Sequence, residues 1–276
     1  MKRTINIKGT LLDISSPLVM GILNVTPDSF SDGGQFNEMD RALERVDQMV
    51  REGATIIDIG GYSSRPGAQE ISIQEEVNRV VPVIEKVTSN QDIIISVDTF
   101  RSEVALEALK SGASIVNDIS AGQDDSNMIP LVSQHQVPFI AMHKQGKPQN
   151  MQENPSYNDV VQEVLDYLIM VRDQCFDAGI RDVIVDPGFG FGKTLLHNYA
   201  LLSQLDVFHQ IEVPILIGLS RKSMIYKPLG VEPSSAINGS SFLHAHALDK
   251  GASILRVHDV KEAVECIKLH ELIQVN

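Results

Sequence analysis

Cysteine is scarce in this chain, which holds only Cys175 and Cys266 among its 276 residues. Two thiols are too few for a disulfide framework or a zinc site. Both cysteines lie in segments with helical periodicity, where small apolar side chains pack well. We therefore expect two buried free thiols and no covalent cross-links.

Basic residues and long apolar runs are also in short supply. The chain has 23 Lys and Arg against 36 Asp and Glu, giving a formal net charge of -13. A general nucleic-acid binder carries the opposite sign or a dense basic stripe, so we expect no nucleic-acid partner. No run approaches the roughly 18 apolar residues of a membrane span, and no apolar stretch follows Met1-Lys2-Arg3 as a signal peptide requires. The sequence predicts a cytoplasmic protein without a membrane partner.

The chain further lacks a linker rich in proline, glycine and serine, a low-complexity tract or a block of like charge. Nothing therefore marks a domain boundary. A length of 276 residues with 43% hydrophobic content suits one α/β barrel, for which about 250 residues is typical. We expect residues 1–276 to form a single domain.

The chain does contain a repeated strand ending. Eight short apolar segments rich in β-branched residues each end on side chains able to do chemistry. These endings are Asn24, Asp58, Asp98, Asn117, His143, Asp186, the run Ser220, Arg221 and Lys222, and the pair His258 and Asp259. Each segment precedes a stretch with helical periodicity, and alternating strands and helices imply parallel pairing. Eight repeats predict a closed (β/α)8 TIM barrel with its active site where the strands end. An open doubly wound sheet is the alternative.

Several further elements follow from local patterns. Residues 4–14 alternate in polarity and turn at Lys8-Gly9, which predicts a short N-terminal β-hairpin that plugs the N-terminal end of the barrel. Pro82 is expected to kink or divide a helix over residues 73–89. Two long polar loops, 24–37 and 60–70, have the composition of mobile lids, with ordinary solvated turns as the alternative. Other helices are expected over 101–112, 156–178, 195–209, 234–250 and 260–274.

The glycine-rich segment 188–194 resembles a phosphate-binding loop but has the wrong spacing. Only three residues separate Gly188 from Gly192, whereas a P-loop needs four, and the spacing also fails the dinucleotide fingerprint. We interpret the segment as a flexible loop that offers Phe191 as a stacking surface for a flat ligand. His244 and His246 are two apart on a predicted helix, so they point to different faces and make a poor metal pair.

Asp98, Asn117 and Asp186 each end a predicted buried strand, where an unpaired carboxylate is costly. Ion pairs or helix caps within the scaffold would explain each one alone. Together on one rim, two carboxylates and an amide can bind the edge of a planar heterocycle with several N–H groups. Nearby cations would keep the carboxylates ionised.

Lys222, Arg256 and His258 are the cations expected near these carboxylates. Arg256 and His258 are two apart, so on a strand their side chains point the same way. A guanidinium beside an imidazole suits a phosphate or pyrophosphate, and barrels often bind phosphate near their last two strands. Pairing of Arg256 and His258 with Asp259 or Glu262 is the alternative. No role is predicted for Asp58 or His143.

From about residue 19 to residue 270 the chain resembles the dihydropteroate synthases. The matching motifs are residues 20–34, 60–68, 96–99, 117–119, 186–188, 220–223 and 256–259, in the order that the family has them. The first is 15 residues long and far more specific than any short motif.

The resemblance implies an enzyme of folate biosynthesis, a cytoplasmic Mg²⁺-dependent homodimer targeted by sulfonamides. It would join 4-aminobenzoate to 6-hydroxymethyl-7,8-dihydropterin diphosphate, giving 7,8-dihydropteroate and pyrophosphate. Carried over by motif position, the pterin would be bound by Asp98, Asn117, Asp186 and Lys222, with Met142, Phe191 and Gly218 lining its pocket. The diphosphate would be bound by Arg256, His258 and, through magnesium, Asn24. The aminobenzoate would be surrounded by Ser64, Arg65, Pro66, Lys222 and Ser223. The catalytic residues would be Lys222, Asp186, Asp98, Asp32 and Arg65, with Asp32 helping to assemble the closed site.

Two departures from the family pattern stand out. Tyr62 takes the place of a usual glutamate in the second motif and Ser64 that of a threonine, while residues 233–239 lack a common Glu-Arg pair. These changes affect loop order or sulfonamide affinity. Two other functions stay open: a methyltetrahydrofolate:corrinoid methyltransferase, and a pterin-binding paralogue without catalysis.

Overall fold

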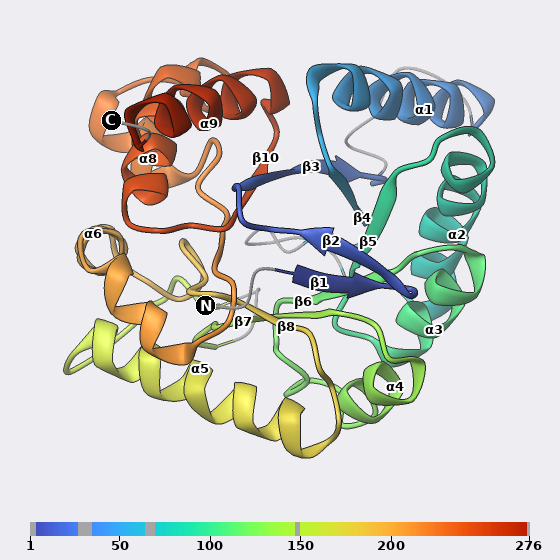
Figure 1. Cartoon of the computed structure of the whole chain (residues 1–276), viewed down its shortest axis with the longest axis horizontal. Coiled ribbons are helices and arrows are strands. Elements are labelled where there is room, and N and C mark those ends of the chain that lie inside the picture. The colour runs from blue at the N-terminus through green and yellow to red at the C-terminus, as the bar shows by residue number, and fades with distance from the viewer. Residues whose placement is uncertain (1–3, 27–34, 64–69, 147–149, 275–276) are drawn as a thin grey trace.

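Eight parallel strands form a nearly closed barrel in the computed structural model, which describes residues 4–26, 35–63, 70–146 and 150–274 (Figure 1). Their order is β8-β7-β6-β5-β4-β3-β10-β9. The bounds are β3 Leu18–Asn24, β4 Ile56–Gly60, β5 Ile94–Asp98, β6 Ile115–Asp118, β7 Phe139–Met142, β8 Val183–Asp186, β9 Leu216–Ile217 and β10 Ile254–Val257. A parallel bridge between Val185 and Ile215 joins β8 to β9. The predicted TIM barrel is confirmed, and the open sheet is excluded.

Helices surround the barrel in the chain order expected for βα units (Figure 1). Their bounds are α1 Gln35–Glu52, α2 Ile73–Asn90, α3 Ser102–Ser111, α4 Met128–His135, α5 Val160–Asp177, α6 Leu195–Ser203, α7 Ser223–Leu229, α8 Ile237–Asp249 and α9 Val260–Gln274, with 3₁₀ helices at Leu205–Ile211 and Pro233–Ser235. The predicted segments 195–209 and 234–250 are therefore each divided in two. The start of α5 is Val160 rather than residue 156, because the Asp159 carboxylate caps the helix by accepting bonds from the Val161 and Gln162 amides.

Helix α2 continues through Pro82, so of the two predicted alternatives the division is excluded, and a kink at this residue stays a prediction. A proline inside a helix costs one hydrogen bond. Here the apolar face formed by Val80, Val83, Ile84 and Val87 is buried against the strands, and this burial offsets the loss.

The side chains that face the barrel interior form two layers. Alternation along each strand places residues two apart on the same face. Near the N-terminal ends lies an apolar set that we call the bottom layer: Met20, Ile56, Ile115, Ile140, Ile184, Leu216 and Ile254. Two positions further along these strands come Ile22, Asp58, Asn117, Met142, Asp186, Gly218 and Arg256. The strand period thus carries five of the predicted site residues, Asn117, Met142, Asp186, Gly218 and Arg256, into the same interior, above an apolar floor.

The N-terminal hairpin, β1 Thr4–Ile7 with β2 Thr10–Asp13, closes the barrel below the bottom layer. Ile5 and Ile14 are 1% and 7% exposed and belong to the same apolar cluster. The hairpin lies across the barrel in Figure 1. The predicted plug is confirmed.

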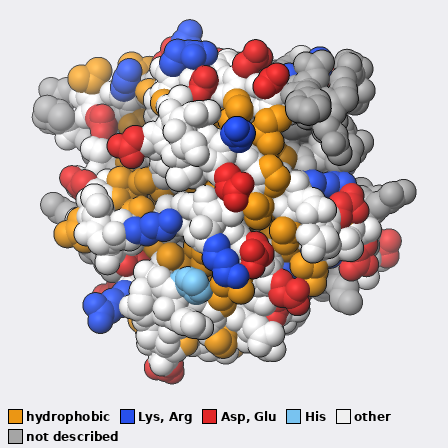
Figure 2. Space-filling view, turned by 90° about the vertical axis from the view of Figure 1, so that its right-hand side faces the viewer, with side chains coloured by type: hydrophobic (Ala, Val, Ile, Leu, Met, Phe, Trp, Pro, Cys, Tyr) orange, Lys and Arg blue, Asp and Glu red, His pale blue; other side chains and the backbone are white. Residues whose placement is uncertain are grey.

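Both cysteines are free thiols, but only Cys175 is buried, and Cys266 is half-buried on α9, so the prediction for Cys266 is wrong. Both predicted lids coincide largely with residues 27–34 and 64–69, which lie outside the described residues. No helix in the described part of the chain is long and apolar enough to cross a membrane. On the face seen in Figure 2, the described basic side chains are scattered among acidic ones without a continuous basic stripe.

The plug predicts a large difference between two residues of one hairpin. Replacing Ile5, 1% exposed, with alanine should lower the free energy of unfolding by about 2–5 kcal/mol, because it opens a cavity against the bottom layer. Replacing Leu11, 66% exposed on the same hairpin, should change it by less than about 0.5 kcal/mol. Urea unfolding of both variants measures this, and equal losses would show that the hairpin does not plug the barrel.

Candidate functional site

A cavity of about 990 Å³ opens at the end of the barrel where the strands finish. Among the predicted site residues, its lining includes Asn24, Asp98, Phe191, Gly218, Lys222, Ser223, Arg256 and His258. Asn117, Met142 and Asp186 lie deeper and are at most 5% exposed. The fold therefore gathers these eleven residues at one end of the barrel. Asp32, Ser64, Arg65 and Pro66 lie outside the described residues.

Arg256 occupies the centre of this group. Its Nε donates to Asp58 Oδ2 and its Nη2 to Asp98 Oδ2, each at 2.6 Å. Asn117 Nδ2 donates to the same Asp58 oxygen at 2.9 Å. The guanidinium is thus bound to two carboxylates inside the barrel. The predicted alternative partner Asp259 is not its ligand.

Asp58 is the main residue that sequence reasoning missed. It is fully buried, and its carboxylate links Arg256 to Asn117. One signal could have found it: Asp58 lies two positions after Ile56, so it faces the interior like the other site residues. The partner of a buried carboxylate there had to be a cation from another strand.

The electrostatics of the group depend on burial and on this pairing. Burial raises the pKa of Asp98, and the Arg256 guanidinium opposes the rise. Burial acts to lower the pKa of Arg256, but Asp58 and Asp98 together raise it above its usual range. Arg256 therefore stays charged and opposes the neutralisation of Asp98.

Lys222 is the second cation of the cavity. Its Nζ donates to the Phe189 carbonyl oxygen and lies 4.8 Å from the centre of the Phe191 ring. Burial lowers the pKa of Lys222 to about 8, although Asp186 acts to raise it. Burial likewise raises the pKa of Asp186, and Lys222 opposes that shift. One face of the predicted stacking residue Phe191 is thus covered by an ammonium group.

The loop that carries Phe191 is held by a buried lysine. Lys193 is 3% exposed, and its Nζ donates to the carbonyl oxygens of Gly188 and Phe191 at 2.9 and 3.1 Å. It also lies 2.9 Å from His143 Nδ1, which is neutral because burial and Lys193 lower the pKa of His143 to about 3. Segment 188–194 is therefore a hydrogen-bonded loop and not the flexible one that its composition predicts.

Gly188 shows why this loop needs glycine. Its φ is +71°, and a Cβ there would lie 1.8 Å from the His143 carbonyl oxygen. Only a residue without a side chain permits such a close approach between the loop and the end of β7.

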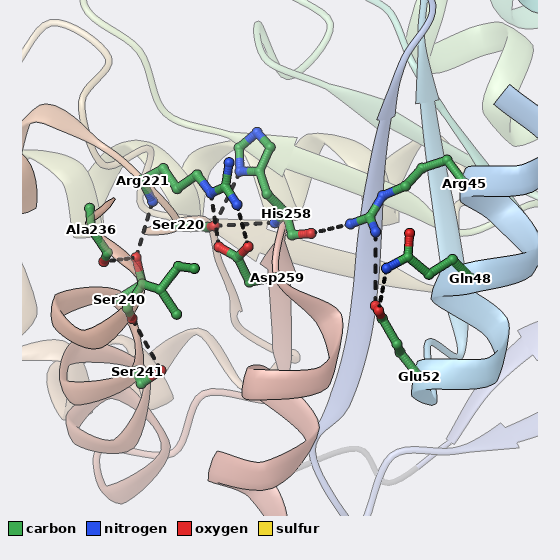
Figure 3. A network of polar contacts seen from close by, with 11 residues as sticks. Arg45, Gln48, Glu52, Ser220, Arg221, Ala236, Ser240, Ser241, His258 and Asp259 are labelled. Atoms are coloured by element: carbon green, nitrogen blue, oxygen red, sulfur yellow. Dashed lines mark hydrogen bonds and ion pairs between the residues drawn. The ribbon is translucent and has the colours of Figure 1, made fainter. Parts of the chain in front are cut away.

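The loops after β9 and β10 are joined by a polar network (Figure 3). Arg221 Nε donates to Asp259 Oδ2 at 3.0 Å, and a second bond makes the pair bidentate. Ser220 Oγ accepts a bond from the His258 amide at 3.1 Å and lies 3.1 Å from its ring Nδ1. Arg45 of α1 donates to the His258 carbonyl oxygen. His258 is therefore held at the cavity wall by Ser220 and Arg45.

Asn24 ends β3 and lines the cavity with a carboxamide, which offers an oxygen ligand. The described residues contain no cluster of three or more His, Cys, Asp or Glu able to hold a metal. His244 is 2% exposed on α8, and burial lowers its pKa to about 4, so it is a core residue.

The family model for pterin-binding enzymes matches residues 20–258. The chain is 48% identical over 266 residues to a dihydropteroate synthase of Escherichia coli K12, which covers 96% of this chain and 94% of that protein. The chain belongs to the dihydropteroate synthase family. This confirms the resemblance seen in the motifs.

Two solved structures of the family agree in fold. The Yersinia pestis dihydropteroate synthase with a sulfonamide drug has a TM-score of 0.93 and 45% identity, covering 99% of this chain and all of that one. The Xanthomonas albilineans dihydropteroate synthase with 4-aminobenzoic acid has a TM-score of 0.94 and 38% identity over the full length of both. The barrel and its hairpin are therefore those of the family.

Proposed function

We propose that this protein condenses 6-hydroxymethyl-7,8-dihydropterin diphosphate with 4-aminobenzoate, forming 7,8-dihydropteroate and pyrophosphate. The observation that carries the proposal is the buried group of Asp58, Asp98, Asn117 and Arg256 facing a large cavity in a chain of this family. A related Xanthomonas albilineans enzyme binds 7,8-dihydropteroate, which supports this product. We take residues 1–276 to act as one catalytic domain.

The carboxylate side of the cavity is suited to the pterin. Asp98, Asn117 and Asp186 can accept from and donate to the ring edge, while Met142, Phe191 and Gly218 offer apolar walls. Asp58 Oδ1 and Ser96 Oγ have no hydrogen-bond partner among the described residues. These two buried oxygens are therefore available for hydrogen bonds with a polar ligand or with water.

The cation side is suited to the diphosphate. Lys222, Arg256 and His258 line it, and two of the five N–H groups of Arg256 bind carboxylates, so its guanidinium can serve both sides. A single protein oxygen from Asn24 fits Mg²⁺, which usually keeps waters and binds substrate phosphates. Bound there, magnesium would spread the charge of the leaving group.

The aminobenzoate is assigned to the outer part of the cavity. Ser223, exposed at the start of α7, lines it beside Lys222. Ser64, Arg65 and Pro66 join this set by motif position, and Asp32 would complete the closed site.

The chemistry requires positioning more than acid–base catalysis. The neutral aromatic amine attacks the exocyclic carbon, the C–O electron pair leaves with pyrophosphate, and the amine proton passes to solvent. Electron donation from the dihydropterin ring eases C–O cleavage, so we assign a dissociative displacement. Cations aimed at the departing oxygens supply most of the stabilisation.

Pyrophosphate release tests the activity directly. Purified protein with pterin diphosphate, 4-aminobenzoate and Mg²⁺ should release pyrophosphate, and excess EDTA should abolish release until Mg²⁺ is restored. Pterin binding by calorimetry without any release would identify a silent paralogue. Methyl transfer from methyltetrahydrofolate to a corrinoid, without release, would identify the methyltransferase alternative.

Lys222 should impose an alkaline limit on activity. Its pKa of about 8 means that the ammonium, which attracts the diphosphate, is lost as pH rises through about 8. The pKa of Lys222 in the folded protein lies below the ordinary value of 10.5. Between about pH 8 and pH 10.5, the unfolded chain therefore binds more protons at Lys222 than the folded protein does. The contribution of Lys222 to the free energy of unfolding consequently rises with pH in this range. A fall in kcat/KM above about pH 8 would thus not reflect unfolding through this group.

Arginine stays charged throughout this range, so Lys222→Arg should lower the absolute kcat/KM but move the alkaline fall to higher pH. Lys110→Arg, an exposed substitution on α3, should leave the profile unchanged. Profiles from about pH 6 to about pH 10 measure this. The same alkaline fall in Lys222→Arg would assign it to another group.

We also propose a cytoplasmic homodimer, as the family resemblance implies. The outer faces of the neighbouring helices α8 and α9 expose Phe242, Leu269, Leu272 and Ile273 by 63–73%. Sedimentation velocity should give the mass of two chains, and Phe242→Glu with Leu269→Glu should give one, because buried charges oppose association. Phe176→Glu on α5 is the matched control. A monomeric wild type would exclude the homodimer.

A further inference from the structure

Tyr62, which departs from the family pattern, packs against the loop after β5. Its ring meets the Phe100 ring edge to face, with centroids 5.2 Å apart and planes at 88°. The guanidinium carbon of Arg101 lies 5.2 Å from the centre of each ring. A cation over an aromatic face is attractive, and more so when it is shielded from water. The Arg101 side chain is only 12% exposed.

The far side of Arg101 is fixed by a buried carboxylate. Nη1 donates to Glu76 Oε2 at 2.9 Å, and Thr99 Oγ1 donates to Glu76 Oε1 at 2.7 Å. Glu76 belongs to α2 and is fully buried. Arg101 Nη2 also lies 3.9 Å from Oε1 of Glu70. One guanidinium therefore contacts the residue pair that flanks segment 63–69, Tyr62 before it and Glu70 after it.

The preceding backbone is also held firmly. Arg79 Nη1 donates to the Gly61 carbonyl oxygen at 3.0 Å, and a Cβ on Gly61 would lie 2.8 Å from Val80 Cγ1. The start of the loop is thus pressed against α2. Tyr62 and Ser63 then line the same cavity as Lys222 and Ser223.

We propose that Tyr62, Phe100 and Arg101 form an anchor that holds Tyr62 and Ser63 at the cavity wall and thereby sets the affinity for 4-aminobenzoate. The anchor stands in place of the carboxylate that the family usually has at position 62, using the face of an aromatic ring to bind the cation. These are positioning residues. The link to 4-aminobenzoate rests on the function proposed above.

Steady-state kinetics test the anchor through the split between the two substrates. Tyr62→Ala should raise KM for 4-aminobenzoate about tenfold, the size expected when a shielded cation–π contact is lost. KM for the pterin diphosphate should change less than about twofold, since its proposed ligands lie on the strands. Tyr62→Phe keeps the ring and should raise this KM much less than Tyr62→Ala does.

Replacing Arg101 alone would leave the buried Glu76 carboxylate without its ion-pair partner. Arg101 and Glu76 are therefore replaced together. Arg101→Met with Glu76→Gln should reproduce the Tyr62→Ala effect without leaving an unpaired charge. Adding Tyr62→Ala to this double variant should raise KM little further, because residues of one anchor are not additive. The proposal would be overturned if Tyr62→Ala multiplied the KM for 4-aminobenzoate of the double variant by a further factor of about ten. It would also be overturned if KM rose about tenfold for both substrates. Arg172→Met, which removes a partly buried arginine on α5, is the control.

Hydrogen exchange provides a readout that does not depend on activity. Amides in a peptide covering residues 61–72 should exchange faster in Tyr62→Ala and in the Arg101 double variant than in wild type and Tyr62→Phe. If the wild type lacks synthase activity but this difference is seen, the proposed function fails and the anchor stands. Equal exchange rates in all four proteins would contradict the proposed anchor even if the enzyme is active.

Discussion

Arg256 connects three strands from inside the barrel, because its guanidinium on β10 binds Asp58 of β4 and Asp98 of β5. Burying these charges is costly, and the cost is recovered only when donors and acceptors are well aligned. The bottom layer and the hairpin plug make that alignment effective, since they present apolar side chains rather than water beneath the charges. The remaining features of the cavity follow: carboxylates on one side, and between the two proposed substrate ends the Arg256 guanidinium, whose pKa these carboxylates raise.

Much of this arrangement was predictable from a period of two residues. Strand endings at Asn117 and Asp186 lie two positions after bottom-layer isoleucines, so the sequence placed them correctly on one interior face. The partner of Arg256 was not predictable, because 198 residues separate it from Asp58 and no local pattern reports which strands face each other across a barrel. The sequence does predict Arg256 near Asp98, and Asp58 is the partner that it does not reveal.

In the loop after β8, the contacts differ from what the residue composition predicts. Its spacing differs from that of a nucleotide-binding loop, and its glycine content predicts flexibility. The glycines instead permit close approach, as at Gly188, and Lys193 fills the loop with its own hydrogen bonds. Composition alone cannot distinguish these two uses of glycine, because both follow from the missing Cβ, and the contact with His143 on a neighbouring segment decides between them.

The two ends of the cavity are built under different physical constraints. On the strands, Asp58 is fully buried and Asp98 is partly buried, and both bind Arg256, so replacing either would remove a partner of this guanidinium. At Tyr62, the requirement is only that the side chain binds the Arg101 guanidinium, and a carboxylate or an aromatic face can do so. This difference explains why the chain departs from its family at Tyr62 while its strand motifs match. A residue can be replaced by one of a different type where several kinds of side chain can bind the same cation. Arg101 is such a cation, since it binds both an aromatic ring and a carboxylate.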